Sequence, residues 1–321
     1  MKAINQVDSK LIWQEHPDPD IKEGEVLIAV KATAVNRADL IQRSGNYPPP
    51  KGASLILGLE CAGVIQEVGK NTKAFKEGDE VCALLSGGGY AELVAVPEGQ
   101  VLNKPKGLSF KEAAALPEVF ATAYLNLYMG GELRDNETVL IHAGASGVGT
   151  AAIQICKVFN NPCFVTAGNE KKIARCIDLG ASGGLVRSKQ GFVDEVLKWT
   201  DQKGVNVILD PVGASYLEDN LNCLSMEGRL IIIGLMGGDQ GNLKINQLLM
   251  KRARISGSTL RAQSIESKTN IMHNLKKDIW PFIEGKEIKP IIDTVFPIQE
   301  AEKAHELIAG NLTFGKVVLK L

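Results

Sequence analysis

Histidine is scarce in this sequence of 321 residues, and its four copies are widely dispersed, at His16, His142, His273 and His305. Zinc ligands normally recur at short, characteristic intervals, so this spacing does not predict a metal site. The six cysteines are scattered too, without a CxxC pair, at Cys61, Cys82, Cys156, Cys163, Cys176 and Cys223. Most lie in apolar surroundings, and we expect them to be small buried side chains. His142, on an apolar strand, is also expected to be a core residue with its polar atoms satisfied.

Charge imbalance and long apolar runs are absent as well. The formal net charge of −1 gives no electrostatic reason to expect nucleic acid or an anionic membrane as a partner. The longest apolar run, residues 230–233, is too short to cross a bilayer. The chain opens with Met1-Lys2-Ala3-Ile4, without an apolar signal core or an Arg-rich transit segment. We therefore expect a cytoplasmic globular protein, and 321 residues are enough for two domains.

The first third of the chain has the pattern of short strands separated by turns. Strand-like stretches occupy residues 25–32, 62–68 and 90–96, and Gly or Pro residues punctuate them. Tyr47 and the three prolines that follow it predict a loop, because neither a helix nor a central strand tolerates three consecutive prolines. Together these features indicate a compact, β-barrel-like domain.

After Leu116-Pro117 the pattern changes to alternating strands and helices. Predicted strands are residues 163–166, 184–186, 205–209, 230–233 and 255–258, and predicted helices are residues 171–179, 192–199, 217–224 and 245–251. This alternation is typical of an α/β domain with a doubly wound parallel sheet. A helix predicted over residues 265–282 and strands at 291–296 and 316–319 are not needed for that sheet. They could return to the first domain, which would make it discontinuous.

A glycine-rich turn follows the strand-like residues before His142. Gly144 and Gly149 occupy the outer positions of a GxGxxG pattern, but Ser146 holds the middle one. Such a turn lets backbone N–H groups approach a phosphate at a helix N-terminus. The alternative is bare packing of a helix against a strand, since small-residue turns occur there as well.

The end of the second strand of this domain bears on the choice of cofactor. An acidic residue there selects NAD by binding its ribose hydroxyls. Here the strand ends at Gly168-Asn169, followed by Glu170 and two lysines, and Arg187 ends the next strand. Lys172 and Arg187 can bind a ribose phosphate with charge-assisted hydrogen bonds, so NADPH is favoured. The alternative is that Lys171 and Lys172 are simply solvated residues of the first helical turn.

The order of motifs resembles the zinc-independent quinone oxidoreductases of the medium-chain dehydrogenase/reductase superfamily. The matching stretches are residues 36–40, 58–60, 84–89, 114–118, 121–124, 142–149, 234–238 and 314–319, which together cover nearly the whole chain. The resemblance implies a GroES-like β-barrel catalytic domain of residues 1–121 and 261–321. It further implies a Rossmann NADPH-binding domain of residues 122–260 and a homodimer formed through the last strand of that domain.

Residue types also argue against a zinc enzyme within this superfamily. The ligands of zinc-dependent relatives would fall near Asn36 and at Leu59, and neither Asn nor Leu is a plausible zinc ligand. The four-cysteine lobe of those relatives is missing, since Cys82 is followed by no other cysteine up to Tyr90.

The resemblance also implies roles for individual residues. Asn36 and Tyr47 would line the substrate site, Thr122 would lie near the nicotinamide, and Gly147, Val148, Lys172 and Arg187 would hold the phosphates and adenosine. The remaining cofactor candidates are Gly144, Ser146, Gly149, Gly168, Asn169, Gly234 and Leu260. Tyr47 could instead anchor the proline loop, and Gly234 could be a plain strand-end turn. Asp210, before Pro211, suits a turn, and no catalytic role is assigned to it.

A metal-free site suits hydride transfer to an acceptor whose conjugation spreads the developing negative charge. The expected function is hydride transfer from NADPH to a quinone. The alternatives are an alkenal or enoyl reductase, which shares this chemistry, and a protein that binds NADPH without turnover.

Overall fold

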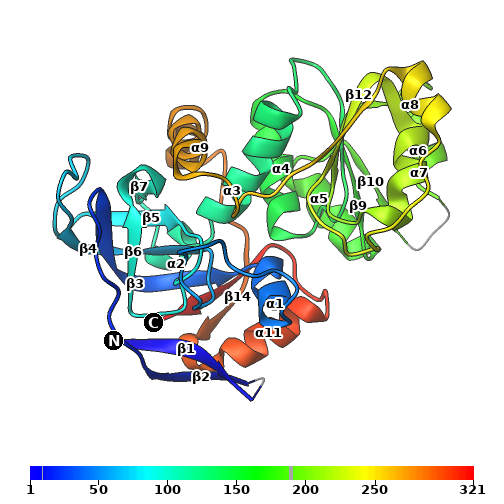
Figure 1. The fold of residues 1–321 in the computed structure, drawn as a ribbon. Helices are drawn as coiled ribbons and strands as arrows, with labels where there is room; N and C mark the ends of the chain where they lie inside the picture. Colours follow the sequence, from blue (N-terminus) through cyan, green and yellow to red (C-terminus); the bar gives the residue numbers. More distant parts are fainter. Residues whose placement is uncertain (9, 188–190) are drawn as a thin grey trace. The chain divides into compact units, whose positions relative to one another are not determined.

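The structure, a computed structural model, describes residues 1–8, 10–187 and 191–321. The chain divides into two compact units. Unit 1 consists of Met1–Ala121 and Leu260–Leu321, and unit 2 of Thr122–Thr259. Unit 1 therefore contains both ends of the chain, which Figure 1 marks N and C.

Unit 1 is built on a seven-stranded sheet in the order β14-β15-β3-β4-β5-β7, with β6 also paired to β3. Its strands are β3 (Glu25–Val35), β4 (Glu60–Val68), β5 (Glu80–Leu84), β6 (Leu93–Pro97), β7 (Val101–Asn103), β14 (Ile292–Pro297) and β15 (Lys316–Lys320). The C-terminal strands β14 and β15 belong to this sheet, since β15 pairs with both β14 and β3. The predicted strand at 90–96 starts too early, because Ala91 forms only an isolated bridge with Ala3 and regular pairing begins at Leu93.

The sequence pattern did not predict the N-terminal hairpin of β1 (Lys2–Val7) and β2 (Lys10–Glu15). The helices of this unit are α1 (Arg37–Arg43), η1 (Glu98–Gln100), α2 (Phe110–Ala113), α9 (Ile265–Asp278), α10 (Trp280–Glu284), η4 (Ile298–Glu300) and α11 (Ala301–Ala309). The single helix predicted over 265–282 is wrong, since it is broken between α9 and α10. Pro281, near the start of α10, has no N–H to continue the hydrogen bonds of α9.

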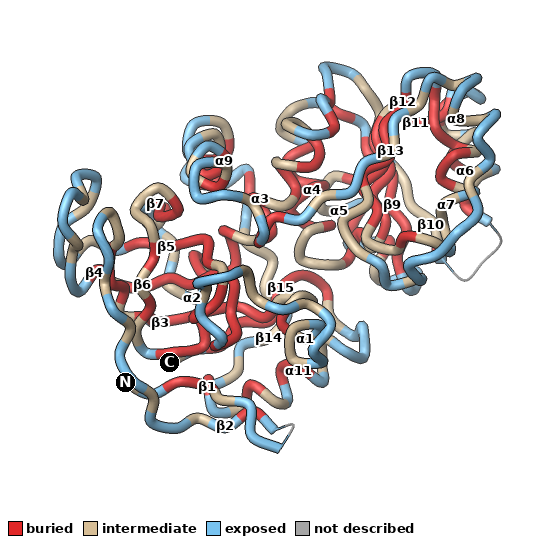
Figure 2. Tube along the Cα trace, in the orientation of Figure 1, coloured by how far each residue is buried: buried red, intermediate tan, exposed pale blue. Residues whose placement is uncertain are grey.

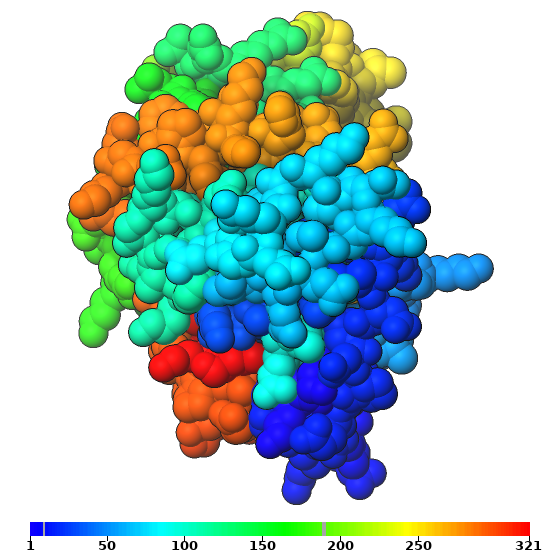
Figure 3. All heavy atoms as spheres, turned by 90° about the vertical axis from the view of Figure 1, so that its left-hand side faces the viewer, coloured from blue at the N-terminus to red at the C-terminus, as the bar shows by residue number. Residues whose placement is uncertain are grey.

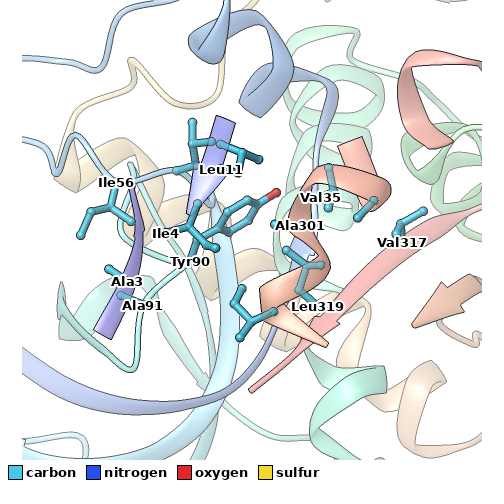
Figure 4. Packing of buried hydrophobic residues seen from close by; sticks show 13 residues of the cluster. Ala3, Ile4, Leu11, Val35, Ile56, Tyr90, Ala91, Ala301, Val317 and Leu319 are labelled. Atoms are coloured by element: carbon cyan, nitrogen blue, oxygen red, sulfur yellow. The ribbon is translucent and has the colours of Figure 1, made fainter. Parts of the chain in front are cut away.

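Apolar clusters form the core of the described part of unit 1. One lies within the sheet and includes Ile28, Ile65 and Val81, all almost fully buried. Another joins the hairpin, β15 and α11 around Tyr90, whose ring lies among aliphatic side chains in Figure 4. The buried stretches of β3, β4 and β5 are red in Figure 2. Atoms of the last residues (red) lie among those of the first hundred (blue to cyan) on the face of Figure 3, as the pairing of β15 with β3 requires.

Unit 2 contains a six-stranded sheet in the order β10-β9-β8-β11-β12-β13, and all its strand pairs are parallel. Its strands are β8 (Val139–Ile141), β9 (Cys163–Ala167), β10 (Gly183–Val186), β11 (Val205–Asp210), β12 (Leu224–Ile232) and β13 (Arg254–Gly257). The strand order reverses at β8, so the doubly wound prediction is confirmed. The predicted strand at 230–233 is the C-terminal half of the longer β12.

Helices cover both faces of this sheet. They are α4 (Gly147–Val158), α5 (Glu170–Leu179), α6 (Val193–Trp199), η3 (Ala214–Tyr216), α7 (Leu217–Cys223) and α8 (Ile245–Lys251). Figure 1 shows α4 and α5 on one side, and α6, α7 and α8 on the other. The helix α3 (Pro117–Tyr124) runs across the boundary of the two units and continues into the π-helical turn η2 (Leu125–Gly130).

Candidate active site

The glycine turn lies between β8 and α4 and is very tightly packed. A Cβ at Gly149 would lie 2.5 Å from Ala143 O, and one at Gly144 would lie 2.8 Å from Val165 Cβ. Ala143 takes a left-handed backbone with φ of 54°. Only glycine fits at the two outer positions of the motif, because any side chain there would collide with backbone or core atoms. Packing alone thus requires both glycines.

Ser146, at the middle position, is the N-cap of α4, and its Oγ accepts the N–H of Gly149 at 3.0 Å. The first N–H groups of a helix have no acceptor within the helix. Because the serine satisfies the Gly149 N–H, those of Gly147 and Val148 remain for an acceptor outside the helix. Two N–H groups at the N-terminus of a twelve-residue helix are suited to bind a phosphate oxygen, which fits a dinucleotide.

The carboxyl ends of β9 and β10 carry the candidate residues for the adenosine side. Asn169 caps α5, since its Oδ1 accepts the Lys172 N–H at 2.9 Å. A Cβ at Gly168 would meet no atom within 4 Å, so the space beside the strand end is open. Arg187 is exposed, and its N–H donates to Ala167 O at 2.9 Å, which places it beside the end of β9. The structure therefore brings Gly168, Asn169 and Arg187 to one edge of the sheet.

A buried chain of hydrogen bonds starts at His142, just before the glycine turn. The sequence did not predict that these residues would be linked. His142 Nδ1 lies 3.0 Å from Thr166 Oγ1, and its Nε2 lies 2.7 Å from Asn220 Oδ1. Asn220 Nδ2 donates to Asp210 Oδ2 at 2.9 Å. The carboxylate of Asp210 also accepts the N–H groups of Val212 and Gly213. The predictions of a satisfied core histidine and of a turn at Asp210 are confirmed.

The ionisation of this chain follows from its burial. Burial lowers the pKa of His142 to about 4 and raises the pKa of Asp210 to about 6. His142 is therefore neutral near pH 7. The chain of hydrogen bonds links the ends of β8, β9 and β11 without a buried cation. We conclude that it holds the strand ends, and with them the glycine turn, in place.

Gly234 follows β12 in a crowded strand-end turn. A Cβ at Gly234 would lie 2.8 Å from Pro211 O. This close approach explains why the residue is glycine even if no cofactor contacts it. It favours the interpretation of Gly234 as a plain strand-end turn. Leu260, at the start of the returning segment, is buried and accepts the Gln263 N–H through its carbonyl.

In unit 1, Asn36 lies at the centre of a buried polar network. Its Nδ2 donates to Glu60 Oε1 at 2.9 Å and to Ala34 O at 3.3 Å, and its Oδ1 accepts from Lys316 Nζ at 2.7 Å. Lys316 Nζ also lies 2.7 Å from Glu60 Oε1 and donates to Val35 O. All hydrogen-bonding groups of the Asn36 side chain thus have protein partners, which makes Asn36 a positioning residue more than a free donor.

A second carboxyl group extends this network. Asp39 Oδ2 accepts the Asn36 N–H at 2.8 Å, and Asp39 Oδ1 accepts the Gly58 N–H at 2.9 Å. Tyr90 Oη lies 3.1 Å from His305 Nε2 and 3.4 Å from Asp39 Oδ2. Burial raises the pKa of Asp39 to about 6 and lowers that of His305 to about 4. No local sequence pattern linked these partners to one another, because they come from distant segments.

Glu118 is the second residue of the helix α3 and is joined to the same network. Its N–H donates to Glu60 Oε2 at 3.0 Å, while its own Oε2 is buried without a hydrogen-bond partner. Burial, followed by the charge of Glu60, raises the pKa of Glu118 to about 8. Thr122, one turn further along α3, is half-buried, and its carbonyl accepts from Asn126 Nδ2 at 2.7 Å. The Ala-Leu-Pro-Glu motif contained Glu118, but no local signal showed that its carboxyl would be buried.

Tyr47 is held in its loop by Arg261. Arg261 Nη1 donates to Tyr47 O at 3.4 Å, and its Cζ lies 5.5 Å from the centroid of the Tyr47 ring. These contacts support an anchoring role for Tyr47. Within the described residues its hydroxyl has no hydrogen-bond partner, which leaves it available as a donor. Burial raises the pKa of Tyr47, so the hydroxyl keeps its proton near neutral pH.

Within the described residues, no three His, Cys, Asp or Glu side chains lie close enough together to hold a metal ion. All six cysteines are buried and free, as expected. In residues 1–8, 10–187 and 191–321, no helix has both the length and the apolar composition needed to cross a bilayer.

The sequence matches two family models. The alcohol dehydrogenase GroES-like domain matches residues 22–106, and the zinc-binding dehydrogenase model matches residues 147–277. Human quinone oxidoreductase is 32% identical over 307 residues, which cover 94% of this chain and 91% of that protein. The zebrafish (Danio rerio) synaptic vesicle membrane protein VAT-1 homolog is 30% identical, and the chain spans 65% of its length.

Solved structures agree with these matches. The Escherichia coli quinone oxidoreductase complexed with NADPH has a TM-score of 0.87 at 27% identity and covers 100% of this chain and 99% of its own. An NAD-dependent alcohol dehydrogenase has the same TM-score at 31% identity, with both chains fully covered. A GroES-like unit and a parallel sheet of the dinucleotide-binding type are thus found together in this chain. The chain belongs to the medium-chain dehydrogenase/reductase superfamily, as an oxidoreductase of the quinone oxidoreductase type.

Proposed function

We propose that this protein transfers a hydride from NADPH to a quinone without a metal ion. The observation that carries the proposal is the position of Asn36, where zinc-dependent relatives would have a ligand. Its amide is fully engaged by Glu60 and Lys316, and Leu59 stands at the other ligand position. Within the family, the motifs most resemble the tumour-suppressor-inducible quinone oxidoreductase, and we propose that closer relationship as well.

The preference for NADPH rests on the strand ends of unit 2. No acidic side chain stands at the end of β9, where Asn169 instead caps α5. Lys172 in the first turn of α5 and the exposed Arg187 can supply positive charge to a ribose phosphate. The N–H groups of Gly147 and Val148 would bind the pyrophosphate, and Gly144 and Gly149 allow its close approach. Gly234, Leu260 and Thr122 would adjoin the nicotinamide half.

NADPH supplies the hydride when bound, so the residues of unit 1 need only bind and orient the acceptor. We propose that Tyr47 donates a hydrogen bond to an acceptor carbonyl, since its hydroxyl is protonated and has no partner among the described residues. Asn36, held by Glu60 and Lys316, would fix the wall of the site. Conjugation in the acceptor spreads the charge that develops, so a single donor and solvent suffice.

The experiment is a panel of acceptors with the purified protein and NADPH or NADH. We expect 1,4-benzoquinone or an orthoquinone to accelerate NADPH oxidation, with a lower KM for NADPH than for NADH. In Tyr47→Phe, kcat should fall about tenfold, since one hydrogen bond to a developing charge contributes about 1.5 kcal/mol. Rapid reduction of alkenals alone would assign the protein to the enone reductases. Tight NADPH binding without any turnover would leave only a binding role.

We also propose that the protein forms a homodimer through β13, the edge strand of unit 2. Ser258 donates its N–H to Ile232 O, so the alternation of a strand turns the Ile255 N–H toward the open edge. Ile255→Pro removes that donor and should shift the sedimentation coefficient from dimer to monomer. A monomeric parent protein would contradict this proposal.

A further inference from the structure

We propose that Arg261 and Lys268 form an anion site in unit 1 that binds a carboxylate carried by the acceptor substrate. The proposal names a substrate class for the proposed function. The part that assigns the carboxylate to the hydride acceptor rests on that function. Neither residue was a candidate from the sequence. Both come from the segment that returns to unit 1 after Thr259.

Both cations are almost completely buried. Arg261 is 3% exposed and Lys268 is 4% exposed. Within the described part of the chain, neither has a carboxylate within salt-bridge distance. Removing a charge from water is unfavourable unless a counter-ion or a full set of hydrogen bonds replaces the lost hydration. Two such cations side by side therefore indicate a place for an anion.

The two side chains converge on one residue, Ser86. Arg261 Nε donates to Ser86 O at 2.9 Å, and Lys268 Nζ donates to Ser86 Oγ at 2.6 Å. The loop that holds Ser86 is tight, because a Cβ at Gly87 would lie 2.5 Å from Ser54 O. The guanidinium and the ammonium are thus fixed near each other on a rigid support, as a binding site requires.

Each cation keeps donors that the protein does not use. Arg261 Nη2 is buried without any hydrogen-bond partner. Lys268 Nζ has three hydrogens, and Ser86 Oγ is its only partner among the described residues. Planar guanidinium donors match the two oxygens of a carboxylate.

The carboxyl group of Glu118 does not fill this role. It acts on both cations electrostatically, but it forms no ion pair with either, and its Oε2 is itself unpaired. With its pKa raised to about 8, it is mostly uncharged at pH 7. No carboxylate of the described residues thus pairs with these cations, which leaves the site to an anion from outside the chain.

The position of Arg261 indicates that the anion arrives with the acceptor. Arg261 binds the carbonyl of Tyr47 and lies over its ring, and Tyr47 is the donor proposed for the acceptor carbonyl. The cofactor phosphates have their own proposed site at the turn of unit 2. A conjugated carbonyl compound that also carries a carboxylate would use both groups, with its carbonyl toward Tyr47 and its carboxylate toward Arg261 and Lys268.

The test compares trans-3-benzoylacrylate with its methyl ester as acceptors, and the saturated 3-benzoylpropionate with its ester as ligands in thermal unfolding without turnover. We expect the acid to have a KM at least tenfold below that of the ester, and the saturated acid alone to raise Tm. Arg261→Met and Lys268→Met should each lose this preference. Lys276→Met, with the same charge change at an exposed position of α9, should keep it.

Equal behaviour of acid and ester in the parent protein would overturn the proposal, as would a preference that survives in both variants. Weaker NADPH binding in the variants, without a change in the acid-to-ester ratio, would also overturn it and assign the cations to a cofactor phosphate. If the saturated acid raises Tm but neither benzoylacrylate nor 1,4-benzoquinone is reduced, the anion site stands and the proposed function fails. If Arg261→Met does not fold, the ratio of the KM values for acid and ester in Lys268→Met tests the proposal.

Discussion

Lys316 and Glu60 form a nearly fully buried ion pair, with 2.7 Å between Lys316 Nζ and Glu60 Oε1. The side chains are 4% and 0% exposed. Lys316 comes from the terminal strand and Glu60 from β4, and Asn36 binds both of them. The pair therefore fastens the returning C-terminal segment to the N-terminal part of the sheet and holds Asn36 between them.

Lys316→Met should strongly destabilise unit 1. The variant leaves a buried carboxylate without its cation, which costs about 3–5 kcal/mol in free energy of unfolding. Urea unfolding at pH 7, followed by circular dichroism, measures the loss. Lys303→Met is the matched control, because Lys303 pairs with Glu300 at 2.9 Å on the surface and should change stability by less than about 1 kcal/mol. Equal effects of the two variants would contradict a structural role for the buried pair.

The Glu118→Gln variant should become more stable relative to the parent protein as the pH rises. The pKa of Glu118 is raised from 4.5 to about 8 in the folded protein, so between these values the folded state binds the proton more tightly than the unfolded state. The parent protein then loses up to about 1.4 kcal/mol of stability per pH unit over this range, and the glutamine variant avoids that loss.

Urea midpoints at pH 5, 6, 7 and 8 measure the effect. Glu112→Gln is the control. Hydrogen bonds from Ser109 lower the pKa of Glu112 from 4.5, so its contribution is already complete above that value, and the difference between Glu112→Gln and the parent should change little between pH 5 and 8. A difference between Glu118→Gln and the parent that does not change with pH would show that the Glu118 carboxyl is not held protonated.

His142 should be a neutral imidazole with its proton on Nε2. Asn220 Nδ2 donates to Asp210, so Asn220 Oδ1 must accept from His142 Nε2–H, and His142 Nδ1 accepts from Thr166. With the pKa lowered to about 4, the stability contributed by the neutral form is complete above about 6.5 and is lost as the pH falls toward 4. Imidazole ¹⁵N shifts, assigned with His142→Gln, should show no titration above pH 5. A midpoint near 6.5 would contradict the hydrogen-bond chain.

Gly149→Ala should destabilise unit 2 and weaken NADPH binding. Helix propensity alone predicts a gain of about 1 kcal/mol for alanine inside a helix. The added Cβ would lie 2.5 Å from Ala143 O, and such overpacking costs about 1–3 kcal/mol, so the sign should reverse. Thermal unfolding and NADPH titration measure the two effects. Gly191→Ala, where the nearest atom to an added Cβ would be Asp219 Oδ2 at 4.0 Å, should leave Tm within a few degrees. Unchanged Tm and NADPH affinity in Gly149→Ala would show that the turn can relax.

Local patterns in the sequence predicted the secondary structure well where the periodicity was strong. Alternating strands and helices correctly indicated the parallel sheet around β8, and the three prolines after Tyr47 correctly indicated a loop. The failures were at places where distant contacts decide. The N-terminal hairpin was not predicted, because no apolar pattern in its sequence marks the two strands. The helix predicted over 265–282 is divided into two helices before Pro281.

The sequence by itself determined the glycine turn, the helix that follows it and the absence of zinc-ligand types at Asn36 and Leu59, because these depend on residue identity and short spacing. Only the tertiary structure decided which polar groups meet inside unit 1. Lys316, Glu60 and Asn36 are brought together by β15, β4 and the end of β3, and Arg261 and Lys268 by a segment that returns after unit 2. No local pattern encodes such meetings, since they depend on strand pairing between residues far apart in the chain.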